Sequence, residues 1–125
     1  MDTNGNLRAL LFKDLCGRLP YGTKVNAANK YISTISSINI GITTLILLKD
    51  VSPVFGIDDV KPYLRPMSSM TEEEEKEFQE IKLSYHFDED SYILLDWLNK
   101  KGFDYRGLIP MGLALEATKG MYNVK

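Results

Sequence analysis

Leucines recur at helical spacing near the start of the chain, at Leu7, Leu10, Leu11 and Leu15. Residues three and four apart lie on one face of an α-helix, so this pattern predicts an amphipathic helix over residues 7–16. We expect Asn6 to cap the start of this helix and Gly17 to end it in a left-handed conformation.

The pattern then changes to that of strands. Residues 31–40 and 42–48 are rich in Ile, Thr and Ser or Leu, which favours extended structure. Tyr31 and Ile35 fall on one face of the first segment but Ile38 falls on the other, and a β-bulge near Ser36 and Ser37 restores a single face. Three or four short strands of this kind predict a small antiparallel sheet, of which a partly open SH3-like barrel is one form.

Prolines set the next segment apart. Pro62 lies within Val60–Leu64, and because proline cannot donate to a strand ladder we expect a short edge strand or an extended crossing there.

The second half of the chain has the signals of helices. Thr71 and Glu74 have the spacing of a capping box, which predicts a helix running to about Leu83. A further helix is expected after Asp90, and Gly102 suits the position just past its end. The same pattern suggests a Schellman stop, in which Phe103 contacts Leu98. Asp104 is expected to cap a short third helical turn through Leu108, and residues 113–117 to return as a strand or an extended segment.

Strands and helices are therefore segregated along the chain, which favours an α+β fold over a parallel α/β sheet. We predict one domain over residues 1–125, in which residues 1–70 hold the N-terminal helix and the sheet and residues 71–125 hold the helices packed on it. The 125 residues, 44% of them hydrophobic, suffice for a core without disulfides.

Charge follows the same division. Residues 1–70 carry eight Lys or Arg and five Asp, and residues 71–125 carry seven Lys or Arg and twelve Asp or Glu. The net charge of −2 argues against broad nucleic-acid binding but leaves a basic N-terminal half.

The cysteine and the N-terminus bear on location. Cys16 is the one cysteine, so no internal disulfide or multi-thiolate metal site can form within one chain. The start of the chain lacks the pattern of a signal peptide, and the apolar stretch Ile38–Leu48 is too short to span a bilayer. We expect a cytoplasmic protein, with no metal, no other cofactor and no membrane partner.

One histidine and one thiol are the candidates for catalysis. His86 lies among the acids of Tyr85–Asp90 and could act as a general base or metal ligand. The alternative is an interhelix loop whose acids cap the next helix. Cys16 could be a nucleophile paired with His86, but its place on the apolar helix favours a small buried side chain.

The segment Lys61–Pro66 is the main candidate for binding. Lys61 and Arg65 could contact phosphates while Tyr63 stacks on a base, with Lys24 and Lys30 on the same surface. The segment could equally offer an edge to a partner protein. The third interpretation is a structural crossing, in which Tyr63 and Leu64 pack and the charges stay solvated.

Two stretches carry a resemblance: Lys61–Glu74, which reads KPYLRPMSSMTEEE, and Phe103–Ile109, which reads FDYRGLI. They are similar to a family of small uncharacterised proteins from phages and integrated elements of gut Bacteroidales. The chain departs from that family at Pro110–Met111, where the family has acidic and basic residues. The resemblance implies a mobile-element origin and a cytoplasmic setting in the bacterial host, and no activity.

These observations favour a non-enzymatic protein-interaction or accessory module with a protein partner. A nucleic-acid-binding module that uses a basic face of residues 1–70 is the alternative, and a small enzyme centred on His86 is the second alternative.

Overall fold

The computed structural model describes residues 3–84 and 91–122. The helices are α1 (Thr3–Arg18), α2 (Glu72–Ser84) and α3 (Ser91–Lys101), with 3-10 turns at η1 (Leu19–Tyr21), η2 (Ile57–Asp59) and η3 (Met67–Ser69). The strands are β1 (Lys24–Ala27), β2 (Tyr31–Asn39), β3 (Leu45–Leu48), β4 (Val54–Phe55), β5 (Val60–Leu64) and β6 (Leu115–Glu116).

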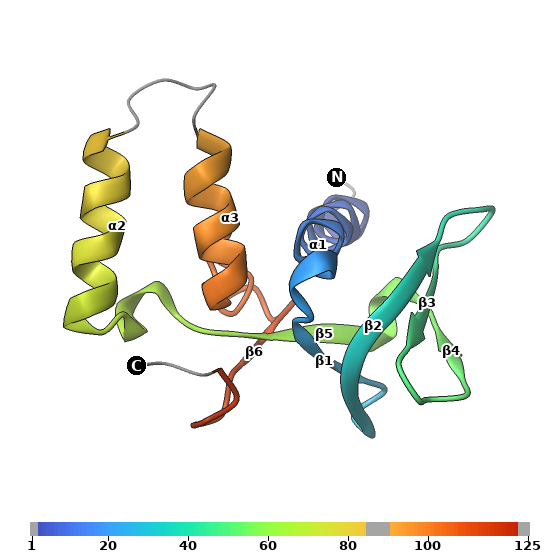
Figure 1. Cartoon of the computed structure of the whole chain (residues 1–125). Coiled ribbons are helices and arrows are strands. Elements are labelled where there is room, and N and C mark those ends of the chain that lie inside the picture. The colour runs from blue at the N-terminus through green and yellow to red at the C-terminus, as the bar shows by residue number, and fades with distance from the viewer. Residues whose placement is uncertain (1–2, 85–90, 123–125) are drawn as a thin grey trace.

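The strands form one open sheet in the order β4-β3-β2-β1-β5-β6. All neighbours are antiparallel except β5 and β6. Helix α1 lies across one face of the sheet, and α2 and α3 stand side by side beyond the end of β5 (Figure 1). The α+β class is confirmed, and the sheet remains open rather than closing into a barrel.

The core lies between α1 and the sheet. Its buried apolar side chains come from α1, from all strands except β2 and β6, and from the segment that leads to β6: Leu11, Leu15, Val25, Ala27, Ile46, Leu48, Phe55, Val60, Leu64, Leu108 and Ala114. We call this set the apolar core. The face of the sheet turned away from α1 is called the outer face below.

Helix α1 is longer than the sequence pattern predicted. Asn6 and Gly17 both lie inside it, and the left-handed residue is Gly22, with φ 66°, after η1. The helix continues because Arg18 donates from Nε to Asp14 Oδ2 at 2.8 Å, one turn earlier. The prediction that Cys16 is buried is wrong, because its side chain is on the exposed side of the helix.

The bulge in β2 is confirmed. Ile35 pairs with Leu48 and Ser37 with Leu47, so the register shifts at Ser36. The extra residue brings Ile38 onto the inner face, where it packs on the apolar core together with Tyr31 and Ile35.

The prediction of an edge strand at Val60–Leu64 is wrong, because β5 lies between β1 and β6. The amide of Ala28 donates to Asp59 O at 2.8 Å, which makes these two residues a hydrogen-bonded pair. Pairs alternate along an antiparallel ladder, so Val25 and Pro62 form a pair without hydrogen bonds. The missing N–H of Pro62 therefore faces away from β1, and an interior strand tolerates the proline.

Both predicted helix signals are confirmed. Thr71 N donates to Glu74 Oε1 at 3.0 Å and Glu74 N to Thr71 Oγ1 at 3.1 Å, which is a complete capping box. At the end of α3, Phe103 N donates to Leu98 O, and Gly102 N to Asn99 O, the pattern of a Schellman motif.

The third helical turn is not formed. The carboxylate of Asp104 accepts hydrogen bonds from Leu108 N at 2.8 Å and Ile109 N at 2.9 Å, but the residues between them make turns rather than a helix. The chain then returns as β6, as predicted.

Candidate functional site

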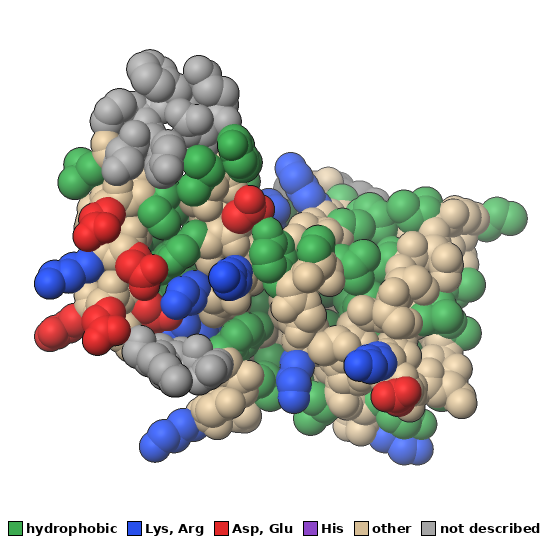
Figure 2. Space-filling model, viewed as in Figure 1, with side chains coloured by type: hydrophobic (Ala, Val, Ile, Leu, Met, Phe, Trp, Pro, Cys, Tyr) green, Lys and Arg blue, Asp and Glu red, His purple; other side chains and the backbone are tan. Residues whose placement is uncertain are grey.

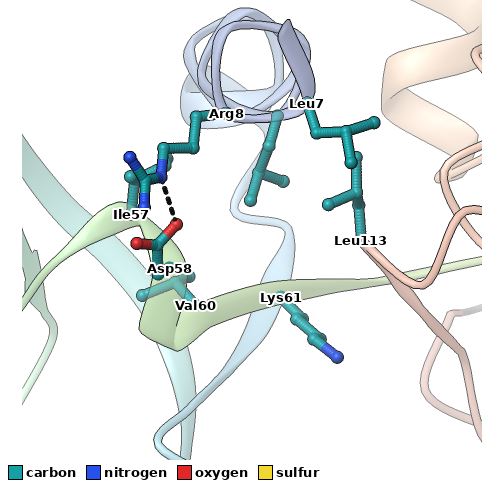
Figure 3. A pocket seen from close by; sticks show the side chains of 8 residues that line it. Leu7, Arg8, Ile57, Asp58, Val60, Lys61 and Leu113 are labelled. Carbon is teal, nitrogen blue, oxygen red and sulfur yellow. Dashed lines mark hydrogen bonds and ion pairs between the residues drawn. The ribbon is translucent and has the colours of Figure 1, made fainter. Parts of the chain in front are cut away.

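The segment from Lys61 to Pro66 divides its side chains between two environments. Lys61 is half-buried and leaves β5 on the side opposite Leu7 and Leu113 (Figure 3). Tyr63 and Arg65 are buried, at 8% and 7% exposure. The expectation that Arg65 presents its charge on the surface is therefore corrected, since its side chain is enclosed by protein.

The outer face brings together two of the predicted cations. Lys61 pairs with Asn26, whose Nδ2 donates to Tyr63 Oη at 3.1 Å, so these three residues share that face. Lys24 lies two residues before Asn26 on β1 and is exposed on the same face. Lys30 lies beyond the end of β1, with its Nζ 5.3 Å from the ring centroid of Tyr31. The four predicted cations therefore do not form one cluster.

Arg65 is held by a bidentate ion pair with Glu74. Its Nη2 lies 2.7 Å from Glu74 Oε1 and its Nη1 lies 2.8 Å from Oε2, while its guanidinium stacks 4.2 Å from the ring centroid of Phe103. The hydrogen bond from Arg65 is the main reason why the pKa of Glu74 falls to about 2, and the Thr71 amide lowers the pKa further. Glu74 is thus a buried anchor rather than part of a solvated acidic helix start.

A second buried charge group joins α1 to the segment after α3. Asp14 is fully buried and accepts from both Arg18 Nε at 2.8 Å and Arg106 Nε at 3.1 Å. Arg18 also donates from Nη2 to the carbonyl of Phe103 at 2.7 Å. We call Asp14, Arg18, Arg65, Glu74 and Arg106 the charged junction.

An aromatic row runs beside the charged junction. Trp97 is half-buried and stacks between Phe78, with ring centroids 6.0 Å apart, and Phe103, at 5.7 Å. This row connects α2 to α3 and to Phe103, whose ring is covered by the Arg65 guanidinium. Both stacking contacts of Trp97 are therefore made within the helical half.

The largest cavity described, of about 520 Å³, lies beside Arg65. One wall is the segment from Arg65 to Thr71, and the other is the segment from Glu116 to Tyr122. Tyr122 donates from its hydroxyl to Tyr63 O at 2.6 Å, and burial raises its pKa, so this wall presents a neutral phenol. We call this space the Arg65 cavity.

A smaller cavity of about 260 Å³ lies between α1 and β5. Its walls are mostly apolar, and the ion pair between Arg8 Nε and Asp58 Oδ1, 2.8 Å long, lies at one side (Figure 3). Both of these charged side chains are more than half exposed. The cavity continues the apolar seam beneath α1 and offers few polar groups to orient a ligand.

Apolar side chains are exposed at the end of the sheet formed by β2, β3 and β4. The exposed fractions are 73% for Ile40, 107% for Ile42, 42% for Leu45 and 51% for Val54. We call these four residues the apolar end. The hairpin between β2 and β3 projects from the body (Figure 1), whereas charged side chains crowd over α2 and α3 (Figure 2).

Neither candidate for catalysis gains support. His86 lies outside the described residues. Partial burial raises the pKa of the Cys16 thiol, which is the opposite of what an activated nucleophile requires. Within residues 3–84 and 91–122, no group of three His, Cys, Asp or Glu side chains is placed to hold a metal ion. None of the helices described is long and apolar enough to cross a membrane.

Comparison with known protein families finds no matching family model. Comparisons with curated proteins and with solved structures likewise find no match. The functional argument therefore rests on the geometry of the chain.

Proposed function

We propose that this protein is a non-enzymatic interaction module that binds a partner protein through the apolar end. The resemblance of two sequence stretches to phage and mobile-element proteins supports an accessory role in the cytoplasm of a bacterial host. The observation that carries the proposal is the exposure of four aliphatic side chains, Ile40, Ile42, Leu45 and Val54, at a single end of the sheet.

Single exposed apolar residues are common on protein surfaces, but a group of them marks an interaction surface. Leu45 and Val54 lie on the outer face, because their strand neighbours Ile46 and Phe55 pack inward. Ile40 and Ile42 extend the same surface onto the projecting hairpin.

The chemistry of this surface selects an apolar partner. None of the four side chains is charged, and the strand ladder beneath them fixes the positions of Leu45 and Val54. A surface that is ordered before binding loses little conformational entropy when a partner docks. The binding energy would then come mainly from burial of the isoleucines at the hairpin.

The test uses photocrosslinking from the hairpin. A photoreactive phenylalanine replaces Ile42, and the labelled protein is irradiated in a lysate of host cells. We expect a discrete adduct that excess unlabelled wild-type protein removes and that an excess of the double variant Ile40→Ser/Ile42→Ser does not. A matched control carries the same crosslinker at Leu95, which is 42% exposed on α3.

The proposal fails if position 42 gives no discrete adduct, or if wild type and the double variant compete equally. An adduct whose partner is a second copy of this chain would identify the apolar end as a self-association surface, which contradicts a distinct partner.

A second candidate function, nucleic-acid binding, is favoured by one observation: Lys24 and Lys61 share the outer face with the amide of Asn26. Fluorescence anisotropy with a labelled single-stranded oligonucleotide tests it. Each lysine that contacts a phosphate should contribute about 0.7 to the slope of log affinity against log salt, so Lys24→Ala and Lys61→Ala should each lower the slope by that amount. Lys100→Ala, an exposed lysine on α3, is the control. Equal slopes for wild type and all three variants would exclude nucleic-acid binding through the outer face.

A further inference from the structure

The Arg65 cavity has a donor that the fold does not use. The four hydrogen bonds of the Arg65 side chain all start from its two terminal nitrogens, at Glu74 Oε1 and Oε2, Lys101 O and Ser69 O. No hydrogen bond starts from its Nε within the described part of the chain. A side chain that is only 9% exposed thus keeps one N–H without a protein acceptor among these residues.

The geometry of a guanidinium indicates where that donor points. Its Nε–H lies on the same edge as the outer N–H of Nη2, which donates to Ser69 O over a long 3.3 Å. Ser69 and Arg65 both line the Arg65 cavity. The edge that carries the free Nε–H therefore lies at the wall of the cavity, beside Ser69.

This edge is also held in place. Glu74 fixes the end of the guanidinium at 2.7 and 2.8 Å, and Phe103 supports its face at 4.2 Å. Of the two parallel N–H groups on this edge, one already donates to Ser69 O, so the Nε–H is left to form one charge-assisted hydrogen bond to a carboxylate or phosphate oxygen. Because Arg65 is already ordered, a ligand loses no free energy in fixing this side chain.

Two further charged side chains line the cavity. Lys119 is exposed and adds a positive charge, whereas Glu116 is exposed and adds a negative one. The volume of about 520 Å³ is within the range of small-molecule sites.

We infer that the Arg65 cavity binds a small molecule through a carboxylate or phosphate oxyanion, which accepts a hydrogen bond from Arg65 Nε while Lys119 attracts it. Glu116 opposes this charge and so limits the affinity for highly charged anions. The inference is independent of the apolar end, which lies at the other end of the sheet.

The test follows the Nε–H signal of Arg65 by nuclear magnetic resonance of the intact protein. Inorganic phosphate and acetate are titrated separately, each against chloride at the same ionic strength. We expect a saturable shift of this signal with at least one oxyanion. Saturation by phosphate alone would indicate a phosphorylated ligand, and saturation by acetate alone a carboxylate ligand.

Two surface variants complete the test without disturbing the buried ion pair. Lys119→Ala should weaken the binding of the saturating oxyanion by up to about five-fold, and Glu116→Gln should strengthen it by a similar factor, as expected for exposed charges. Lys82→Ala, on the exposed side of α2, should leave the affinity unchanged. An Arg65 signal that moves no differently in phosphate or acetate than in chloride would overturn the inference, as would equal affinity in the wild type and the Lys119 and Glu116 variants.

Discussion

The apolar core and the charged junction are two different ways of joining α1 to the rest of the molecule. Beneath the middle of the helix, Leu11 and Leu15 pack on strands, in contacts that have no directional requirement. At its C-terminal end, Asp14 and Arg18 form hydrogen bonds that each require one particular partner. The same face of α1 therefore packs through apolar contacts at Leu11 and Leu15, and through ion pairs and hydrogen bonds at Asp14 and Arg18.

The difference matters because the two kinds of contact fail differently. An apolar core loses stability in proportion to the volume removed and tolerates substitutions of similar size. A buried ion pair that loses one member leaves an uncompensated charge, which costs far more than the intact pair contributes. The junction therefore favours one arrangement of the helical half against the sheet, and substitution there should be poorly tolerated.

The largest effect is expected at Asp14. Asp14→Ala leaves Arg18 and Arg106 without their shared carboxylate, and we expect the free energy of unfolding to fall by about 3–5 kcal/mol. Urea denaturation followed by Trp97 fluorescence measures this change. Asp58→Asn breaks the exposed pair with Arg8 and serves as the control, with an expected change within about 1 kcal/mol. Equal effects at the two sites would remove the distinction between buried and exposed charge.

The next effect is a dependence of stability on pH at Glu74. Its pKa lies near 2 in the folded protein against an ordinary value of 4.5, so the folded state favours the ionised form. The stabilisation is fully present above about pH 4.5 and is lost as the pH falls toward 2, and it amounts to roughly 3 kcal/mol.

Glu74→Gln isolates this contribution from the other carboxylates. The difference in unfolding free energy between wild type and variant should be largest above pH 5 and should narrow steadily toward pH 2. A difference that stays constant over this range would contradict the assignment of the low pKa to the pair with Arg65.

A smaller effect is expected at Gly102, where the charged junction meets the C-terminal segment. Its φ is +81°, and a Cβ built there would lie 2.2 Å from Cε1 of Tyr122. Gly102→Ala should therefore cost more than the roughly 1 kcal/mol of backbone strain, because the Tyr122 ring must also move. Gly112, with φ +77° and open space around it, provides the matched control for strain alone. Thermal unfolding measures the stability of both variants. Equal losses of stability at Gly102 and Gly112 would show that the Tyr122 ring moves aside at no cost.

The smallest effect is expected in the apolar core. Ile46→Val removes one methylene from a fully buried side chain and should cost about 0.5–1.5 kcal/mol. Ile32→Val, on the outer face, is the matched exposed control, and its stability in urea should be close to that of wild type. If Ile46→Val lowered the free energy of unfolding as much as Asp14→Ala, the apolar core would be as sensitive to substitution as the charged junction.

Local signals in the sequence predicted local structure well. The capping box at Thr71 and Glu74, the Schellman stop at Gly102 and the bulge at Ser36 each depend on residues within a few positions, and all three are confirmed. The segregation of strands and helices likewise predicted the α+β class.

The sequence of α1 also contained a signal for buried charge, in addition to its pattern of leucines. Leu11, Asp14, Leu15 and Arg18 follow the i, i+3, i+4, i+7 spacing of one buried helix face. The prediction used only the leucines of that face and ended the helix at Cys16, before Arg18. An Asp and an Arg four residues apart on an apolar face were the available signal for a buried pair.

The chain by itself determined its helix boundaries at Thr71 and Gly102, the bulge, and the division into a sheet half and a helical half, because these follow from contacts between near neighbours. Only the tertiary structure decided that β5 is an interior strand, that Arg65 faces Glu74 and a cavity, and that Asp14 is shared with Arg106, 92 positions away. Burial and charge pairing depend on which distant segment covers a residue, and spacing along the chain does not contain that information.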